Sequence, residues 1–341
     1  MSAAGILLLG RNGQVGWELE RALAPLGRVA ALGRAEADLA SPEALRAAVR
    51  AVRPRWIVNA AAYTAVDRAE AEPEAAFAAN AHAPGVLAEE ARRVGAFLVH
   101  YSTDYVFDGS KGAPYAESDA PAPLSVYGRS KLAGERAVQA AGDDHLILRT
   151  TWVYGARGGN FLRTMLRLFA ERDEVRVVAD QVGAPTWSRM VAGATAAIVA
   201  ASRSGTHGGV YHLAAGGQTS WHGFAEAIRD TVADPGTRVR VAPISTAEYP
   251  TPAARPAWSV LDCGRLARDF GVALPGWRES LELVAGEMDA GRPERSRACS
   301  PVEASLALPA AHRTEPGEQA GFPPGGDEVS GRGRPMVSGG E

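Results

Sequence analysis

The sequence has few cysteines and no long apolar run. Its 341 residues contain two cysteines, Cys263 and Cys299, and neither lies near a second thiol. This spacing excludes a disulfide framework and a cysteine-type zinc site, and it favours a reducing cytoplasm. The longest apolar runs, such as GILLLG at 5–10, have the length of a strand. They fall far short of the roughly 20 residues that a membrane helix needs.

An excess of charge of one sign is also missing. The chain has 36 basic and 39 acidic side chains and a net charge of −3. It therefore shows no basic surface for nucleic acid and no polybasic block for an anionic membrane. The apolar run at 5–10 begins almost at once, without the charged start and cleavage site of a secretory signal. We expect a cytoplasmic protein whose partners include neither nucleic acid nor a membrane.

What the sequence does have is a regular alternation over residues 5 to about 155. Short apolar runs start near positions 6, 29, 56, 97 and 145, and helical patterns such as SPEALRAAVRAV and PEAAFAANAHAPGVLAEEARRV lie between them. Buried strands separated by amphipathic helices are typical of an α/β fold with a parallel sheet covered on both faces. We predict a Rossmann-type, doubly wound domain over residues 1–155.

Beyond residue 155 the pattern is looser. It predicts helices over 160–171, 188–201 and 220–232, strands over 175–180 and 209–215, and a last helix over 276–290. We predict a smaller C-terminal part, residues 156–290, that mainly binds substrate. Residues 291–341 are rich in Gly, Pro and charge, and they hold too few apolar side chains to offset the entropy of ordering. We predict that they form a disordered tail.

A glycine-rich turn follows the first predicted strand. Gly10, Gly13 and Gly16 have the spacing G-x-x-G-x-x-G, one residue longer between the first two glycines than the usual dinucleotide fingerprint. The first glycine allows a tight turn, the second lets backbone N–H groups approach a pyrophosphate, and the third brings the helix close to the sheet. Glycines that only punctuate a turn are the alternative. The position directly after a first strand favours a dinucleotide site.

The end of the second predicted strand bears on the choice of cofactor. Gly33 stands where an acidic residue would hold a ribose hydroxyl, and Arg34 follows it. A guanidinium without a carboxylate favours a 2′-phosphate, hence NADPH. If Arg34 is only a solvated loop charge, NADH is the alternative. The predicted cofactor-binding residues are Gly10, Asn12, Gly13, Gln14, Val15, Gly16, Arg34, Asp38, Leu39, Ala61, Ala62, Tyr63, Thr64, Tyr127 and Lys131. For the small residues at 60–62, plain packing at a strand end is the alternative.

The stretch SVYGRSKLAGE places Tyr127 and Lys131 four residues apart in a predicted helix. Their Cβ atoms are then about 6 Å apart on one face. An ammonium beside a phenol favours the phenolate, so the pair is a candidate for proton transfer. An ordinary surface pair is the alternative, because this short pattern arises often by chance.

Several segments in order resemble one family. LLGRNGQVGWEL, RPRWIVNAAAYTAVDRAE, HYSTDYVFDG, VYGRSKLAGE, RTTWVYG, NFLRTMLRL and DQVGAPT are similar to the dTDP-4-dehydrorhamnose reductases, which are extended short-chain dehydrogenases/reductases. The resemblance runs from about residue 5 to 288. GQVGWEL and STDYVF are specific to the family, whereas the glycine motif and Y-x-x-x-K belong to the whole superfamily. The resemblance implies NADPH-dependent reduction of the C4 ketone of dTDP-4-dehydro-β-L-rhamnose, the last step of dTDP-L-rhamnose biosynthesis.

The resemblance also implies residue roles. Tyr127 would be the general acid, and Lys131 would bind the nicotinamide ribose and lower the pKa of Tyr127. Thr103 would hydrogen-bond the carbonyl oxygen of the substrate, with Ser102 as the alternative. Asp104 and Trp152 match positions that line the sugar pocket, although Asp104 could instead cap the following turn.

Tyr105 separates this chain from sugar-nucleotide 4,6-dehydratases. Those enzymes carry Asp-Glu after the threonine, whereas this chain has Asp-Tyr. The second acid needed to eliminate water is therefore absent, which favours a reductase.

A metal-linked dimer is a further property of the family, whose members can bind Mg²⁺ with glutamates from two subunits. Glu18 and Glu287 match two of these ligands, but Arg189 stands where the family can carry Glu. A cation repels the metal, so the sequence argues against a Mg²⁺ site and leaves a homodimer open. Glu18 is otherwise a solvated helix residue.

Two other functions remain open from the sequence. One is a sister reductase that makes a 6-deoxysugar of opposite configuration at C4. The other is a non-catalytic NADP-binding subunit, similar to the regulatory subunit of methionine adenosyltransferase, but the set of Thr103, Tyr127 and Lys131 argues against it.

Overall fold

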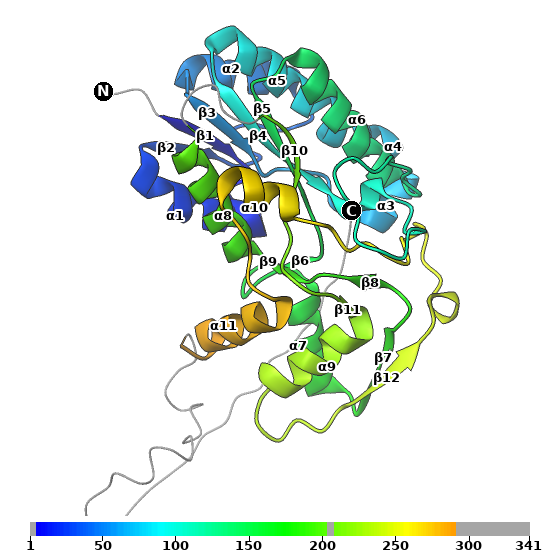
Figure 1. Ribbon diagram of the computed structural model, residues 1–341. Coiled ribbons are helices and arrows are strands. Elements are labelled where there is room, and N and C mark those ends of the chain that lie inside the picture. The colour runs from blue at the N-terminus through cyan, green and yellow to red at the C-terminus, as the bar shows by residue number, and fades with distance from the viewer. Residues whose placement is uncertain (1–4, 203–207, 291–341) are drawn as a thin grey trace, which may run out of the picture. The chain divides into compact units, whose positions relative to one another are not determined.

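The computed structural model describes residues 5–202 and 208–290; Cys299 and the predicted tail at 291–341 lie outside them. Its centre is a six-stranded sheet in the order β10-β5-β4-β3-β1-β2 (Figure 1), and every pair of neighbouring strands is parallel. The strands are β1 (Ile6–Leu9), β2 (Val29–Leu32), β3 (Trp56–Asn59), β4 (Phe97–Thr103), β5 (His145–Thr150) and β10 (Gly209–His212). The predicted Rossmann-type sheet is confirmed. Its order reverses between β1 and β3, and the carboxyl ends of these strands mark the position where such sheets bind ligands.

Helices cover both faces of the sheet because its strands are apolar on both sides. Leu8 packs with the helices of one face and Leu7 with those of the other. One layer consists of α1 (Gln14–Leu23), α8 (Ser188–Ala201) and α10 (Gly264–Phe270). The opposite layer consists of α2 (Pro42–Val52), α5 (Ala83–Val94) and α6 (Val126–Ala141), as Figure 1 shows.

The segment predicted as one helical run at 73–94 is interrupted. It divides into α4 (Pro73–Phe77), a π-helical turn at Ala78–His82, and α5, and it is preceded by α3 (Val66–Ala71). Pro84 lacks the backbone N–H that a regular helix would use. The irregular turn brings the carbonyl of Asn80 against Gly134, where an added Cβ would lie 2.0 Å from that oxygen.

A second core belongs to the smaller part of the chain. It joins Leu162, Phe224, Ile228 and Leu281 in one cluster. Its elements are α7 (Phe161–Glu171), α9 (Trp221–Thr231), α11 (Trp277–Ala290), β7 (Glu174–Val178), β12 (Arg240–Ile244) and the short strands β6 (Val153–Tyr154), β8 (Val182–Gly183), β9 (Thr186–Trp187) and β11 (Thr219–Ser220).

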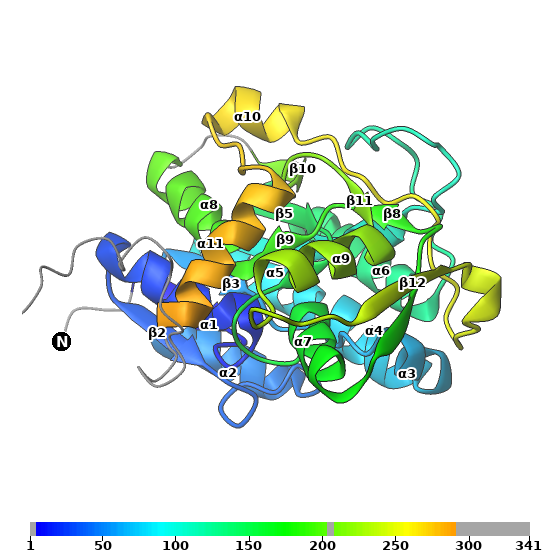
Figure 2. The same ribbon diagram turned by 90° about the horizontal axis from the view of Figure 1, so that it is seen from below.

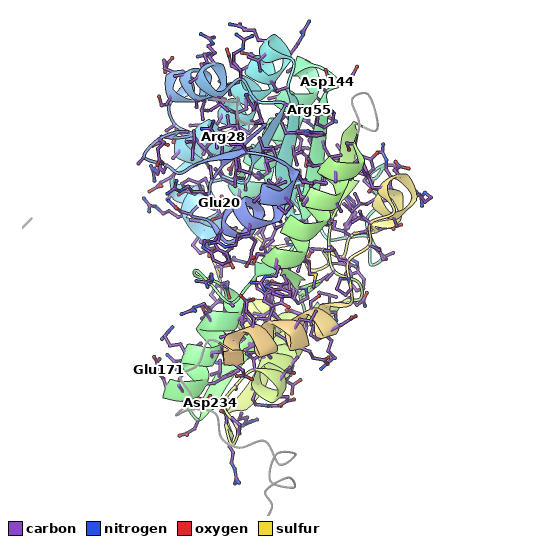
Figure 3. The ribbon with its side chains drawn as sticks, turned by 90° about the vertical axis from the view of Figure 1, so that its left-hand side faces the viewer. Glu20, Arg28, Arg55, Asp144, Glu171 and Asp234 are labelled. Carbon is purple, nitrogen blue, oxygen red and sulfur yellow. The ribbon has the colours of Figure 1, made fainter. Side chains whose placement is uncertain are left out.

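The chain crosses between the two parts more than once. Although it follows residue 155, β10 pairs with β5, and α8 packs on the sheet. The sheet and its helices thus contain residues from both sides of position 155. The predicted division, with cofactor binding before residue 156 and substrate binding after it, stays a prediction. Figure 3 shows Arg55 and Asp144, which precede β3 and β5, far from Glu171 and Asp234 of the smaller part. The carboxyl ends of the strands thus face the smaller part.

Within residues 5–202 and 208–290, no helix has the length and apolar character that would allow it to cross a membrane.

Candidate active site

The glycine turn forms a tight cradle at the point where the sheet order reverses. Gly10 has a φ of +84°, and a Cβ on it would lie 2.7 Å from the backbone nitrogen of Ala61. A Cβ on Gly16 would lie 2.0 Å from the Gly10 carbonyl oxygen. Gly13 is the N-cap of α1 and offers no side-chain cap, so the first N–H groups of this helix stay available to a phosphate. These features fit a bound dinucleotide.

Two neighbours of this turn have side chains in other roles. The Gln14 amide oxygen accepts a hydrogen bond from Asn160 Nδ2 at 2.9 Å, which ties the start of α1 to the loop before α7. Val15 packs against the first core of the sheet. Asn12 lies beside Gly33, where an added Cβ would be 2.8 Å from Asn12 Nδ2.

The end of β2 contains a carboxylate that the sequence analysis missed. The Gly33 N–H donates to Glu36 Oε2 at 2.9 Å. Arg34 is 85% exposed, and its Nε lies 3.2 Å from Asp38 Oδ2. A backbone hydrogen bond from Ala40, and then Arg34, hold the pKa of the Asp38 carboxyl below its usual range. The sequence signal that could have revealed this carboxylate is Glu36, which stands three residues after Gly33.

Leu39, predicted near the adenine, belongs to the core. It packs with Leu7, Leu9 and Leu45 and is 9% exposed. Its side chain packs between the sheet and α2, and this packing holds the segment that follows β2 in place.

The segment after β3 is held by Asn80, which the sequence analysis also missed. Tyr63 N–H donates to Asn80 Oδ1 at 2.9 Å, and Asn80 Nδ2 donates to the Tyr63 carbonyl at 3.0 Å. The Ala61 N–H is bonded to Asn59 Oδ1 at 3.2 Å. Ala62 lies between these anchored residues, and Thr64 is exposed. The predicted residues 61–64 thus form a fixed strip beside the glycine turn.

The three predicted catalytic residues come from two neighbouring elements. Thr103 ends β4, and Tyr127 and Lys131 lie in α6. Ser125 caps α6 by accepting the Gly128 N–H at 3.1 Å, which fixes the first turn of the helix. Tyr105 contacts both hydroxyl-bearing residues: its backbone N–H donates to Thr103 Oγ1 at 3.2 Å, and its ring meets the Tyr127 ring with centroids 5.6 Å apart. The tertiary structure therefore brings Thr103 and Tyr127 together.

The pKa of Tyr127 is shifted in the direction opposite to the expected one. Burial raises it to about 12, and the hydrogen bond to Thr103 opposes this only in part. Lys131 does not lower the pKa of Tyr127 as expected, because its ammonium donates to the Tyr101 carbonyl at 2.5 Å. Burial lowers the pKa of Lys131 to about 8. A phenol with a raised pKa keeps its proton at neutral pH but gives it up less readily than one whose pKa lies near the operating pH.

Asp104 is buried among hydroxyl groups. Its carboxylate accepts from Thr103 at 2.9 Å and from Thr151 at 2.7 Å. Burial raises the pKa of Asp104, although the hydrogen bonds from Thr151, Ser259 and Thr103 oppose this. The structure thus gives Asp104 a role in holding Thr103, and its predicted contact with the sugar stays a prediction. Ser102, the alternative to Thr103, is buried, and its hydroxyl has no partner among the described residues.

Trp152 adopts a backbone conformation that is rare for a bulky residue. Its φ is +44°, and its ring stacks on Trp221 with centroids 3.5 Å apart and planes at 6°. A Cβ on Gly183 would lie 2.5 Å from the Trp152 ring. Trp221 of the smaller part therefore covers one face of the Trp152 ring, a contact that no sequence motif had indicated; the predicted contact of Trp152 with the sugar stays a prediction.

The three residues matched to the metal site of the family also meet. Arg189 Nε lies 3.2 Å from Glu18 Oε2, and Arg189 Nη2 lies 2.6 Å from Glu287 Oε1. They come from α8, α1 and α11, which Figure 2 shows close together. Among the described residues, no cluster of three or more His, Cys, Asp or Glu side chains is arranged to hold a metal ion. The guanidinium bridges the two carboxylates of one chain.

Comparison with known proteins agrees with this geometry. The family model for the RmlD substrate binding domain matches residues 4–290. The dTDP-4-dehydrorhamnose reductase of Burkholderia thailandensis is 54% identical over 293 residues, covering 83% of this chain and 98% of that protein. That of Escherichia coli is 45% identical over 291 residues, covering 83% and 97%. The crystal structure of dTDP-4-dehydrorhamnose reductase from Bacillus anthracis in complex with NADP is 36% identical, with a TM-score of 0.79, and covers 84% of this chain and 100% of that one. The chain therefore belongs to the RmlD family, whose members include these dTDP-4-dehydrorhamnose reductases.

Proposed function

We propose that this protein reduces the C4 ketone of dTDP-4-dehydro-β-L-rhamnose to dTDP-β-L-rhamnose with NADPH. The observation that carries the proposal is the placement of Tyr127 and Lys131, both on α6, beside the carboxyl end of β4: Lys131 donates to the Tyr101 carbonyl, and Tyr105 contacts both Thr103 and Tyr127. The family relationship supports the same reaction. The product is the activated sugar that ends dTDP-L-rhamnose biosynthesis.

The residues divide the reaction between them. NADPH bound along the cradle would supply the hydride. The Thr103 hydroxyl, which donates to Asp104 in the structure, would turn to donate to the carbonyl oxygen and so orient the ketone. Tyr127 then transfers its proton to the developing alkoxide; it is protonated at neutral pH because burial raises its pKa. Lys131 lies on the same helix face and is the cation proposed to bind the nicotinamide ribose.

The test is NADPH oxidation with dTDP-4-dehydro-L-rhamnose, followed by identification of the sugar product. Formation of dTDP-L-rhamnose supports the proposal. A C4 epimer would identify the sister reductase, and cofactor binding without turnover would identify a regulatory subunit. A cytoplasmic location stays a prediction that rests on the cysteine content.

Cofactor choice depends on the charges at the end of β2. We expect wild-type kcat/KM to favour NADPH, and we expect Arg34→Ala to reduce that preference because it removes an exposed cation from the 2′-phosphate position. We expect Glu36→Gln to act in the opposite direction, since this carboxylate beside Gly33 repels a phosphate. Steady-state kinetics with both cofactors measures this. A wild-type preference for NADH would show that Arg34 is only a loop charge.

We infer that a homodimer, if the protein forms one, does not depend on Mg²⁺. Arg189 already neutralises Glu18 and Glu287 within one chain, so these carboxylates are not free to ligate the ion. We expect EDTA or added Mg²⁺ to change neither activity nor sedimentation, and we expect Arg189→Glu to make the oligomeric state sensitive to Mg²⁺. Dissociation of a wild-type dimer by EDTA would contradict this inference.

A further inference from the structure

We propose that Asp67, Arg255 and Tyr105 form a chain of contacts that positions the proton donor Tyr127. The proposal rests on the function proposed above and assigns three positioning residues to it. Asp67 lies in α3, Tyr105 follows β4, and Arg255 lies in the Pro-rich loop at 250–258. These three segments surround the start of α6.

The first link joins Arg255 to Asp67. Arg255 Nη2 donates to Asp67 Oδ2 at 2.7 Å, and Nη1 donates to Asp67 Oδ1 at 3.0 Å, which is a bidentate pair. Arg255 Nη1 also donates to the Ala253 carbonyl at 3.0 Å, and the Ala253 N–H returns a bond to Asp67 at 3.2 Å. The hydrogen bond from Arg255 holds the pKa of Asp67 below its usual range, although burial opposes this. Both side chains are partly buried, so the pair is less screened by water than a fully exposed one.

The second link joins Arg255 to Tyr105. Burial disfavours the charge of Arg255, but its hydrogen bonds to Asp67 and its interaction with the nearby Tyr105 side chain raise its pKa above the ordinary value. The Pro-rich loop also packs directly after Tyr105, because a Cβ on Gly109 would lie 2.7 Å from the Ala257 nitrogen. The loop therefore lies against the segment that Tyr105 begins.

The third link joins Tyr105 to the reacting groups. Its ring meets the Tyr127 ring edge to face, with centroids 5.6 Å apart and planes at 78°. Its backbone N–H donates to Thr103 Oγ1 at 3.2 Å. Tyr105 thus contacts both hydroxyl-bearing residues of the reaction. A shift of its ring would move the Tyr127 hydroxyl relative to Thr103.

A second residue of helix α3, Glu70, binds the start of α6. The Val126 N–H, at the first turn of α6, donates to Glu70 Oε1 at 2.7 Å. Asp67 and Glu70 lie one turn apart on α3. The same short helix therefore anchors the loop that holds Tyr105 and the helix turn that carries Tyr127.

The experiment uses the full-length protein with Asp67→Asn, Arg255→Gln, Arg255→Lys and Tyr105→Phe. We expect Arg255→Gln to lower kcat by about 10- to 100-fold, because small misplacements of a reacting group have effects of this size. We expect the Kd for NADPH to stay within about twofold, and the solvent deuterium isotope effect on kcat to rise, because proton transfer from Tyr127 becomes more rate-limiting. Arg255→Lys should restore only part of kcat, since an ammonium cannot bind Asp67 in a bidentate manner.

A double variant tests whether the residues act as one chain. Asp67→Asn combined with Arg255→Gln should lose no more activity than the less active single variant, because the second change removes a contact already lost. Arg240→Gln is the matched control: its pair with Glu174, 2.9 Å long, is an arginine–carboxylate contact on an exposed surface. We expect its kcat to equal that of the wild type.

Two results would overturn the proposal. One is additive loss in the double variant, and the other is a fall in kcat that follows the folded fraction with an unchanged isotope effect. If Arg255→Gln does not fold, Arg255→Lys and Tyr105→Phe decide the question by the same measurements. Wild-type turnover tests the proposed function, whereas the variants compared with wild type test the chain, so the two failures are distinguishable.

Discussion

Replacing Tyr127 with Phe should lower kcat by at least about 100-fold, which corresponds to a loss of roughly 2.7 kcal/mol of transition-state stabilisation. The reason is that the variant removes the hydroxyl group that we propose as the proton donor, on the first turn of α6. The ring itself is retained in the variant, so its contact with Tyr105 remains. Single-turnover oxidation of NADPH measures the loss directly.

NADPH binding and thermal stability should change little in the same variant, because it keeps the partly buried ring and loses only the hydroxyl group. Tyr249→Phe serves as the control, since that tyrosine is 60% exposed. Near wild-type turnover of Tyr127→Phe would refute the assignment of the general acid.

Replacing Gly10 with Ala should weaken NADPH binding by at least about tenfold and lower the melting temperature. A residue with a side chain in this left-handed conformation costs roughly 1–2 kcal/mol. In addition, the new Cβ would lie 2.7 Å from the Ala61 nitrogen and 2.9 Å from the Ala60 carbonyl carbon, so the ends of β1 and β3 would have to separate. That separation would open the cradle in which the pyrophosphate is expected to lie.

Gly95→Ala separates the two effects. Gly95 has a φ of +71°, but a Cβ there would meet nothing within 4 Å. We expect this control to lose stability from backbone strain alone and to bind NADPH like the wild type. Fluorescence titration with NADPH and thermal unfolding of both variants give the comparison. Equal NADPH affinities for Gly10→Ala and the wild type would show that binding does not need the close approach of Gly10 to Ala61.

The sequence by itself determined the class of fold, and it predicted the reacting groups. Apolar runs near 6, 56 and 97 predicted buried parallel strands because each is too apolar to face water on either side. Glycines at positions 10, 13 and 16 predicted the cradle, since only glycine permits its close approaches. The four-residue spacing of Tyr127 and Lys131 is enough to place them on one face of a helix. These features are local, so short stretches of sequence contain them.

Only the tertiary structure decided how other residues meet. Asp67 and Arg255 are 188 positions apart, and the packing of the Pro-rich loop against α3 brings them together. The stacking of Trp152 on Trp221, and the placement of Arg189 between Glu18 and Glu287, likewise join distant segments. Lys131 illustrates the same limit, because helical spacing set its face, but the position of the Tyr101 carbonyl set its hydrogen bond. Burial, which depends on the folded chain, raises the pKa of Tyr127, whereas the spacing of Tyr127 and Lys131 in the sequence predicted a lower pKa.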